Sequence, residues 1–377
     1  TGSINTILDD ASSITSYIRT INYYDQKGEL IQSTSDNQLG GMERTTTAYT
    51  FTGKIKLIRQ EHTTKNKPYQ CETYRYEYDH ADRLIAENHK INSNMETTLA
   101  SFVYNDLGHL SSKTLGNGET IKYKYNIRNF ELSSSSNHFS EKLYYESGDD
   151  VYTPQKPCYN GNISAMLWNN TVNSEQQRGY DFSYDHLERL TEANYGESGN
   201  LSVNRTRYDE KMSYDVMGNM TSLYRNGLQD DHVYGTIDNL TYTYNGNHLQ
   251  SVSDAADGPC YQGAFHFKDG SSTNVEYEYD RNGNMTKDLN KGISKIEYNL
   301  LNLPSKIIHK DGNMEQYTYS ADGSKLSVTY GINITAIAVP MTKVMNNTST
   351  SLLTGNSSKD NILDEKTYKV SDTIVYD

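Results

Sequence analysis

Tyrosines and other β-favouring residues alternate with polar residues along most of this chain, and this alternation predicts β-strands. Sets of tyrosines spaced two residues apart precede a series of short turns, as at Tyr74, Tyr76 and Tyr78. A spacing of two places each set on one face of a strand. No long stretch has the apolar spacing of a helix, and recurrent Thr, Tyr, Val and Ile favour strands. The pattern therefore predicts an all-β chain.

Each tyrosine set ends in a recurring motif of Tyr, then Asp, Asn or Ser, a short turn, and usually Leu or Met. The Asp or Asn can accept a hydrogen bond from the backbone two residues on, which initiates a turn. A Gly four places after the Tyr supplies positive φ, and the Leu or Met begins the returning strand. The repeating unit is predicted to be a β-hairpin. The positions assigned to this structural motif are Tyr24, Asp25, Gly28, Tyr78, Asp79, Tyr104, Asn105, Gly108, Tyr184, Asp185, Tyr214, Asp215, Gly218, Tyr279, Asp280, Gly283, Tyr319 and Gly323.

Some copies depart from this pattern at the glycine position. Asn129 and Asn302 take its place in two copies, and Asn tolerates the left-handed conformation well. Asp82 and Glu188 take its place in two others, which predicts turns of a different type there. The looser copies begin at Tyr125, Tyr244, Tyr298 and Tyr319, and a further copy opens at Tyr376.

Self-similarity at a period of tens of residues is the signature of a repeat architecture. A single hairpin is only marginally stable in water, so the units are predicted to stack side by side and form one twisted, spiralling sheet. Stacking aligns tyrosines of neighbouring strands into aromatic pairs that contribute about 0.2–1 kcal/mol each. The chain has 33 Tyr but 7 Phe and 1 Trp. That imbalance predicts a thin sheet wetted on both faces.

The spacing of the copies divides the chain into six predicted segments. A serine run and the lone Trp168 interrupt the pattern, although GNISAMLWNN (161–170) is expected to form one strand. Residues 254–274 are expected to form a long loop. The chain stops on the first two residues of its own motif, which predicts a fragment of a longer polypeptide. The segments are 1–20, leading into the array; 21–132, repeats; 133–178, an insertion or diverged repeat; 179–330, repeats; 331–366, a polar loop or linker; and 367–377, the start of a truncated repeat.

The composition of the chain limits the classes of partner that it is expected to bind. The net charge is −13, and a surface this acidic repels phosphate backbones, so we expect no nucleic-acid partner. The chain has no apolar run of about 18 residues, so we expect no membrane insertion. Only 34% of residues are hydrophobic, yet the tyrosine content argues against disorder. Cys71, Cys158 and Cys260 lie far apart and are predicted to be scattered thiols rather than a disulfide framework or zinc site.

The sequence offers no catalytic or cofactor grouping. The ten histidines lack metal-ligand spacing, and no phosphate loop or nucleophile elbow is present. DRNGN (280–284) resembles part of a calcium loop but lacks the closing Glu, and it is the motif turn itself. Paired acids such as Asp149 and Asp150 are predicted to be solvated turns. We therefore predict no cofactor, no metal and no enzymatic activity.

The repeated motif resembles the RHS/YD-repeat family, whose unit is usually written Y-D-x-x-G-R-L. The resemblance covers about residues 21–330 and the last few residues of the chain. The segments YNLLNLPSKI (298–307) and YSADGSKL (319–326) look like those of long repeat proteins from Bacteroidota. The array is diverged, because the family's Arg is kept only at Arg83 and Arg189, where the Gly is lost.

The family implies a β-strip that spirals into a hollow shell, which in polymorphic toxins encloses a variable C-terminal toxic domain. The resemblance thus implies a shell segment of a secreted or cell-surface protein, whose partner is the remainder of its own polypeptide. Neither the family's self-cleaving closing segment nor a toxin domain is recognisable before Asp377. The alternative is an adhesion module that binds glycans through exposed tyrosines.

Overall fold

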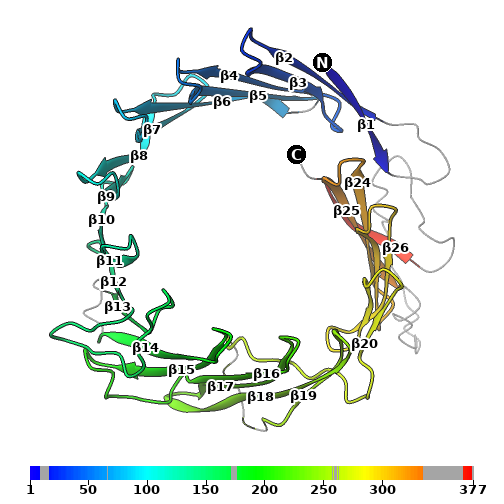
Figure 1. The fold of residues 1–377 in the computed structure, drawn as a ribbon. Helices are drawn as coiled ribbons and strands as arrows, with labels where there is room; N and C mark the ends of the chain where they lie inside the picture. Colours follow the sequence, from blue (N-terminus) through cyan, green and yellow to red (C-terminus); the bar gives the residue numbers. More distant parts are fainter. Residues whose placement is uncertain are drawn as a thin grey trace, which may run out of the picture. The chain divides into compact units, whose positions relative to one another are not determined.

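The computed structural model describes residues 1–8, 17–65, 67–170, 176–256, 258, 261, 263–333 and 368–375. These residues form strands joined by turns and loops, with no helix among them, so the prediction of an all-β chain of tandem hairpins is confirmed (Figure 1). Tyr376 and Cys260 lie outside the described residues, as does most of the predicted segment 331–366.

The strands are short and follow one another closely in sequence. Their bounds are β1 (Gly2–Leu8), β2 (Tyr17–Tyr24), β3 (Leu30–Asp36), β4 (Met42–Tyr49), β5 (Ile55–Thr64), β6 (Lys67–Tyr78), β7 (Leu84–Ile91), β8 (Thr97–Tyr104), β9 (Leu110–Leu115), β10 (Thr120–Tyr125), β11 (Glu131–Ser135), β12 (Phe139–Tyr144), β13 (Ala165–Asn170), β14 (Arg178–Tyr184), β15 (Leu190–Glu197), β16 (Glu210–Tyr214), β17 (Met220–Asp230), β18 (Val233–Asn245), β19 (His248–Asp254), β20 (Tyr277–Tyr279), β21 (Met285–Asp288), β22 (Ile293–Tyr298), β23 (Pro304–His309), β24 (Met314–Ser320), β25 (Lys325–Asn333) and β26 (Tyr368–Val375).

The chain divides into two compact units. Unit 1 comprises residues 1–21, 35–41 and 270–377; unit 2 comprises 22–34 and 42–269. In unit 1, each strand from β20 to β26 pairs antiparallel with the next, and β1 pairs with β2 and, through Ile7 and Leu8, with β24.

In unit 2, β4 to β19 pair in the same sequential antiparallel order. The motif turns all follow even-numbered strands, so they lie on one edge of the strip, which we call the motif edge. The turns after odd-numbered strands form the opposite edge.

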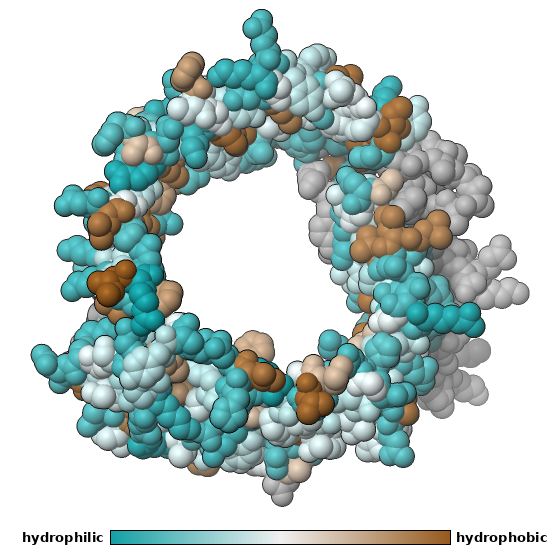
Figure 2. Space-filling view, in the orientation of Figure 1, coloured by the Kyte–Doolittle hydropathy of each residue, from teal (hydrophilic) through white to brown (hydrophobic). Residues whose placement is uncertain are grey.

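The first part of unit 2 is a single layer with almost no core. Among the described residues of 42–143, which we call the bare strip, the buried hydrophobic side chains are Cys71 and Ala100. Figure 2 shows hydrophobic residues standing singly or in small groups among polar ones on the visible face. The prediction of a thin, wetted sheet is correct for this region.

The same prediction is wrong for residues 144–269, which we call the covered strip. The loop that follows β12 folds back onto one face of the strands instead of making a tight turn. Tyr144, Tyr152, Ala165, Leu167 and Leu201 form a buried cluster there, with Ala165 and Leu167 fully inaccessible to solvent. Two loops thus add a second layer to the sheet: the loop after β12, which carries Tyr152, and the loop after β15, which carries Leu201. The strand expected within 161–170 is present as β13.

Two opposed glycines make room for the second of these loops. Gly179 of β14 and Gly196 of β15 are cross-strand partners. A Cβ on Gly179 would lie 2.8 Å from Leu201 Cδ2, and one on Gly196 would lie 2.8 Å from Leu201 Cβ. The absence of both side chains therefore lets Leu201 reach the core cluster, where it is 3% exposed.

The other face of the covered strip carries a row of aromatic rings. Trp168, Tyr180, Tyr195, Tyr208 and Tyr234 contact one another in that order, with successive ring centroids 5.7, 5.4, 5.1 and 5.4 Å apart. Tyr180 and Tyr195 are direct cross-strand partners. The aromatic pairing expected from the sequence is confirmed here.

The long loop between β19 and β20 is held onto unit 2 by a buried carboxylate. Asp238 is completely buried, and its side chain forms an ion pair with Arg225 at 2.5 Å and accepts a 2.5 Å hydrogen bond from the backbone N–H of Phe267. A charge this deeply buried is tolerated because both of its oxygens have partners.

Candidate functional site

The repeated turn at the motif edge is the candidate functional site, because it is the feature that recurs through both units. In each clear copy, the residue after the Tyr closes the turn with two backbone hydrogen bonds. At Asp79, for example, its N–H donates to Arg83 O at 3.0 Å, and its C=O accepts from the N–H of Asp82 at 3.1 Å. The strand that returns is shifted by a β-bulge, with Tyr78 opposite Leu84 and Glu77 opposite Ala86. This is the pattern of a tight turn followed by a left-handed residue and a bulge.

The side chain of the same residue reinforces the turn. Asp79 Oδ1 accepts hydrogen bonds from the N–H groups of Ala81 and Arg83, at 2.9 and 3.0 Å. The bond from the N–H two residues after the Asp is the one predicted from the sequence. The bond from the N–H four residues after it is a finding of the structure. The same pair of bonds forms at Asp25, Asn105, Asn126, Asp185, Asp215, Asp280 and Asn299.

The expectation that the copies lacking Gly have different turns is wrong. Asp82 and Glu188 adopt φ of 57° and 63°, and both turns have the same closing hydrogen bonds as the others. The turn geometry is imposed by the Asx side chain and the two backbone bonds, so an L-residue is held in the left-handed region. The other occupants of this position with positive φ are Gly28, Gly108, Asn129, Gly218, Gly283, Asn302 and Gly323.

In many copies the motif tyrosine links its hairpin to the preceding one. Tyr104 Oη donates to Leu84 O at 2.8 Å, and Leu84 is the sixth residue after the preceding motif tyrosine, Tyr78. We call this bond the hydroxyl staple. It recurs at 2.6–2.9 Å from Tyr49 to Leu30, Tyr78 to Ile55, Tyr214 to Leu190, Tyr244 to Met220, Tyr298 to Met285 and Tyr319 to Pro304. The sequence identified the tyrosines, but it assigned their hydroxyls no common partner.

Sequence reasoning missed one copy of the motif entirely. YTFTGKI (49–55) has Thr where the other copies have Asp, Asn or Ser, so the motif as defined from the sequence does not include it. Thr50 nevertheless closes the same turn, with Gly53 at φ 83° and Lys54 N–H donating to Thr50 Oγ1. The signal that could have found it was the spacing, since Gly53 and Ile55 follow Tyr49 by four and six residues.

The loop after β12 keeps the staple although it lacks the turn. Tyr184 Oη donates to Ile163 O, and Tyr145 Oη donates to Glu131 O. The link from hairpin to hairpin therefore continues through the interrupted region.

The position after the left-handed residue supplies a second link between copies. Arg189 forms an ion pair with Asp185 at 2.7 Å, donates to Asp215 O at 2.9 Å and lies 4.7 Å over the ring of Tyr214. Arg83 likewise pairs with Asp79 and lies 4.7 Å over Tyr104.

Where Asn stands in place of this Arg, its side-chain amide also forms hydrogen bonds within its own turn and to the next turn. Asn219 Nδ2 donates to Asp215 Oδ2 in its own turn at 2.8 Å and to Asn247 Oδ1 in the next turn at 3.2 Å. Asn284 does the same with Asp280 and Asn302. The contact between neighbouring turns is therefore kept where Asn stands in place of Arg.

These hydrogen bonds shift the pKa values of the turn carboxylates. The backbone N–H of Arg83, followed by its guanidinium, lowers the pKa of Asp79 to about 2. The pKa values of Asp25, Asp185, Asp215 and Asp280 are also lowered, chiefly by the backbone or side chain four residues on. These shifts stabilise the ionised form, which is the hydrogen-bond acceptor that the turn needs.

No grouping suited to catalysis or metal binding is found in the part of the chain that the structure describes. No cluster of three or more His, Cys, Asp or Glu side chains could hold a metal ion there. Within those same ranges, no helix is long and apolar enough to span a membrane. Cys71 and Cys158 are free thiols, the first buried and the second half-buried.

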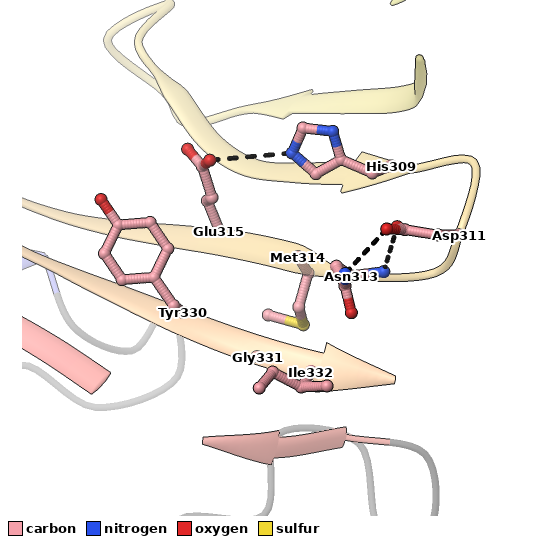
Figure 3. A pocket seen from close by; sticks show the side chains of 8 residues that line it. All are labelled: His309, Asp311, Asn313, Met314, Glu315, Tyr330, Gly331 and Ile332. Carbon is pink, nitrogen blue, oxygen red and sulfur yellow. Dashed lines mark hydrogen bonds and ion pairs between the residues drawn. The ribbon is translucent and has the colours of Figure 1, made fainter. Parts of the chain in front are cut away.

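Unit 1 contains a shallow pocket of about 370 Å³ beside β23, β24 and β25 (Figure 3). His309 Nε2 lies 3.7 Å from Glu315 Oε1, and Asn313 donates to Asp311 from both its backbone and its side chain. Met314 and Ile332 are the apolar side chains that line this pocket. These contacts hold the hairpin together, and they place no nucleophile beside a base.

No protein-family model and no curated protein match this chain. Among solved structures, a chain of the TcdB2-TccC3-Cdc42 complex matches with 13% identity and a TM-score of 0.48, over 83% of this chain and 18% of that chain. A chain of the Photorhabdus luminescens Tc holotoxin pore matches with 12% identity and a TM-score of 0.35, over 88% and 22%. A porin-like protein from Bacteroides uniformis matches with 10% identity and a TM-score of 0.17, over 67% and 93%. This chain thus spans about a fifth of the toxin chains it resembles.

Proposed function

We propose that this chain is a wall segment of an RHS-type shell, in a secreted or cell-surface bacterial protein. The shell would hold or deliver an effector carried by the remainder of the same polypeptide. The hydroxyl staple is the observation that carries the proposal, because it joins hairpin to hairpin at a fixed position in copy after copy.

The energetics suit a wall whose strength comes from repetition. One buried or half-buried hydrogen bond contributes about 0.5–1.5 kcal/mol net, so no single staple decides the fold. In a repeat array, stability is approximately the sum of intrinsic and nearest-neighbour contributions, and the staples and ion pairs supply the neighbour contributions. A strip of this kind can be extended by adding copies without building a larger core.

We propose a non-enzymatic role for the described residues. The carboxylates with lowered pKa values, such as Asp79 and Asp215, are engaged in turn hydrogen bonds, and the tyrosines with raised values, such as Tyr195, are packed in the sheet. Each shift thus has a structural cause. Perturbed groups of this kind mark ion-pair and packing networks as well as active sites.

The glycan-binding alternative receives no specific support. Sugars stack on exposed aromatic faces, whereas the motif tyrosines from Tyr49 to Tyr319 are half-buried or buried. In the stapled copies their hydroxyls already donate to the backbone. We therefore favour the packing role for these rings.

The test is protection of cargo in the full-length parent polypeptide. Limited proteolysis of the native protein should leave the region C-terminal to this array intact, and cleavage should become rapid once the array is unfolded with denaturant. The matched control is the C-terminal region expressed alone, which should be cleaved at the rapid rate in native buffer. Equal cleavage rates for the enclosed and isolated regions would rule out the shell role.

A further inference from the structure

The two edges of unit 2 carry different kinds of side chain. At the opposite edge the tips of the tight turns are mostly polar, as at Asn117, Asn137 and His232, while Met95 in the turn after β7 and Phe265 in the long loop after β19 are exposed apolar residues. At the motif edge, the residues two or three places after the motif tyrosine are repeatedly large and apolar.

The apolar side chains occupy a run of successive turns. They belong to the turns that follow β8, β10, β14 and β16 and to the loop that follows β12, and they are 67–104% exposed. We call this set the apolar tip row. Its members are Leu107, Ile127, Tyr159, Leu187, Val216 and Met217. Phe51, in the turn that follows β4, is 92% exposed and extends the pattern.

The turns themselves do not need these apolar residues. The turn is made by the Asx acceptor, the left-handed residue and the two backbone bonds, none of which involves a tip side chain. The equivalent tip positions hold Lys27, His80 and Asn282 in three other copies, whereas the copy at Tyr298 in unit 1 holds exposed Leu300 and Leu301. In a chain that is only 34% hydrophobic, a row of exposed apolar tips therefore points to a surface that is covered by something else.

We propose that the apolar tip row is an interaction surface for a second copy of this chain, which packs edge to edge in a two-fold dimer. In such a dimer the row of one copy meets the same row of its partner. A two-fold interface pairs a surface patch with itself, so one self-complementary row is sufficient.

The period of the row supports this occupant. Neighbouring strands lie about 4.8 Å apart, so consecutive motif turns, two strands apart, stand roughly 10 Å from each other. A second hairpin strip has the same period, and its tips can fall between those of the first along the whole row. A flat surface or a single helix would not match that spacing over five turns.

The area available fits a dimer of modest affinity. Burying a large aliphatic side chain removes roughly 60–120 Å² of apolar surface from water, so the row would contribute roughly 700–1,400 Å² in the pair. Specific interfaces bury about 1,200–2,000 Å² in total. Each copy also carries a net charge of −13, so the two copies repel one another. Association should therefore strengthen as salt screens that repulsion.

Sedimentation velocity on the intact chain tests the proposal. Over roughly 1–300 µM, the range that resolves a micromolar Kd, the sedimentation coefficient should rise with concentration, and should rise further at high salt. The variant combining Leu107→Asn, Ile127→Asn and Val216→Asn should weaken the dimer at least about tenfold. Asn is a favourable turn residue, so this variant is expected to fold.

The matched control is Met95→Asn, which changes an exposed apolar tip at the opposite edge and should leave the dimer unchanged. Circular dichroism and thermal unfolding check that each variant keeps the fold. A dimer that survives the triple variant would indicate pairing of exposed strand edges and would overturn the assignment. A wild-type chain that is monomeric throughout, or that floats with zwitterionic phosphatidylcholine vesicles while remaining monomeric, would also overturn it.

Discussion

The bare strip and the covered strip use the same hairpin repeat, yet they are stabilised differently. In the bare strip, β4 to β11 form one layer, and the recurring contacts are edge turns, hydroxyl staples and ion pairs such as that between Arg83 and Asp79. In the covered strip, a buried cluster packs on one face and an aromatic row on the other. The difference shows that the motif specifies the hairpin and its register, while the loops between hairpins decide whether a core forms.

The largest expected effect is the loss of the core in the covered strip. Leu167→Ala removes a fully buried side chain and should lower the free energy of unfolding by about 2–5 kcal/mol. The same change at half-buried Leu110 in the bare strip should cost about half as much or less, because less surface is uncovered. Denaturant unfolding monitored by tyrosine and tryptophan fluorescence measures both. Equal losses would mean that the cluster is no more important than the bare layer.

Alkaline pH should also destabilise the covered strip more than the bare strip, because its tyrosines have the larger increases in pKa. Burial raises the pKa of Tyr208 to about 12 and raises those of Tyr180 and Tyr195 above the usual value of 10. A raised pKa means that the contribution is complete below pH 10 and is lost as the pH rises towards 12 and beyond, because the unfolded state ionises first. Absorbance at the tyrosinate band against pH, with unfolding followed in parallel, checks this. Titration of these rings near pH 10 in the folded protein would contradict it.

Removing one staple should have a smaller effect. Tyr104→Phe keeps the ring beneath Arg83 but removes the hydroxyl that donates to Leu84 O, and should cost about 0.5–1.5 kcal/mol. Tyr184→Phe removes the corresponding bond to Ile163 in the covered strip. Hydrogen exchange should show faster opening of β7 to β9 in the first variant. The second should change exchange less, since packing on both faces still holds its strands.

The left-handed position offers a gain in stability. At Glu188, an L-residue at φ 63°, the conformation costs about 1–2 kcal/mol, and Gly relieves this at an entropic cost of about 0.5–1 kcal/mol. Glu188→Gly should therefore raise the free energy of unfolding by up to about 1 kcal/mol, measured by thermal unfolding. Asp82→Gly in the bare strip should gain less, because Asp82 also accepts a hydrogen bond from Thr52. Gly218→Ala is the reverse control and should destabilise.

The smallest expected effect is acid loosening of the turns. The lowered pKa of Asp79, about 2, means that its stabilising contribution is present above the unfolded value near 4 and is lost as the pH falls towards 2. Asp185, whose pKa is lowered in the same way, should behave alike in the covered strip. NMR carboxyl titration measures each value. Asp79→Asn keeps an acceptor oxygen, as Asn105 does, and should remove most of the local pH dependence.

Much of the repeat could be predicted from the sequence because its signals are local. An Asp or Asn directly after the motif tyrosine, as at Asp79, is a property of a single turn. So is a glycine three residues after that Asp or Asn, as at Gly108. Together these two features suffice to predict a hairpin. The copy at Tyr49 was missed because Thr50 replaces the Asx residue, although its hydroxyl fills the same acceptor role. Local spacing still contained that information.

The sequence by itself thus determined the strands, the turns, the motif edge and the order of the hairpins, since each depends on residues within about ten positions. Tertiary structure alone decided the acceptors of the tyrosine hydroxyls, which lie one hairpin back. It also decided the core around Leu167, because the meeting of Leu201 with Gly179 and Gly196 depends on a loop folding back onto strands already paired. Contacts of this kind follow from the stacking of hairpins, and no local pattern of residues specifies them.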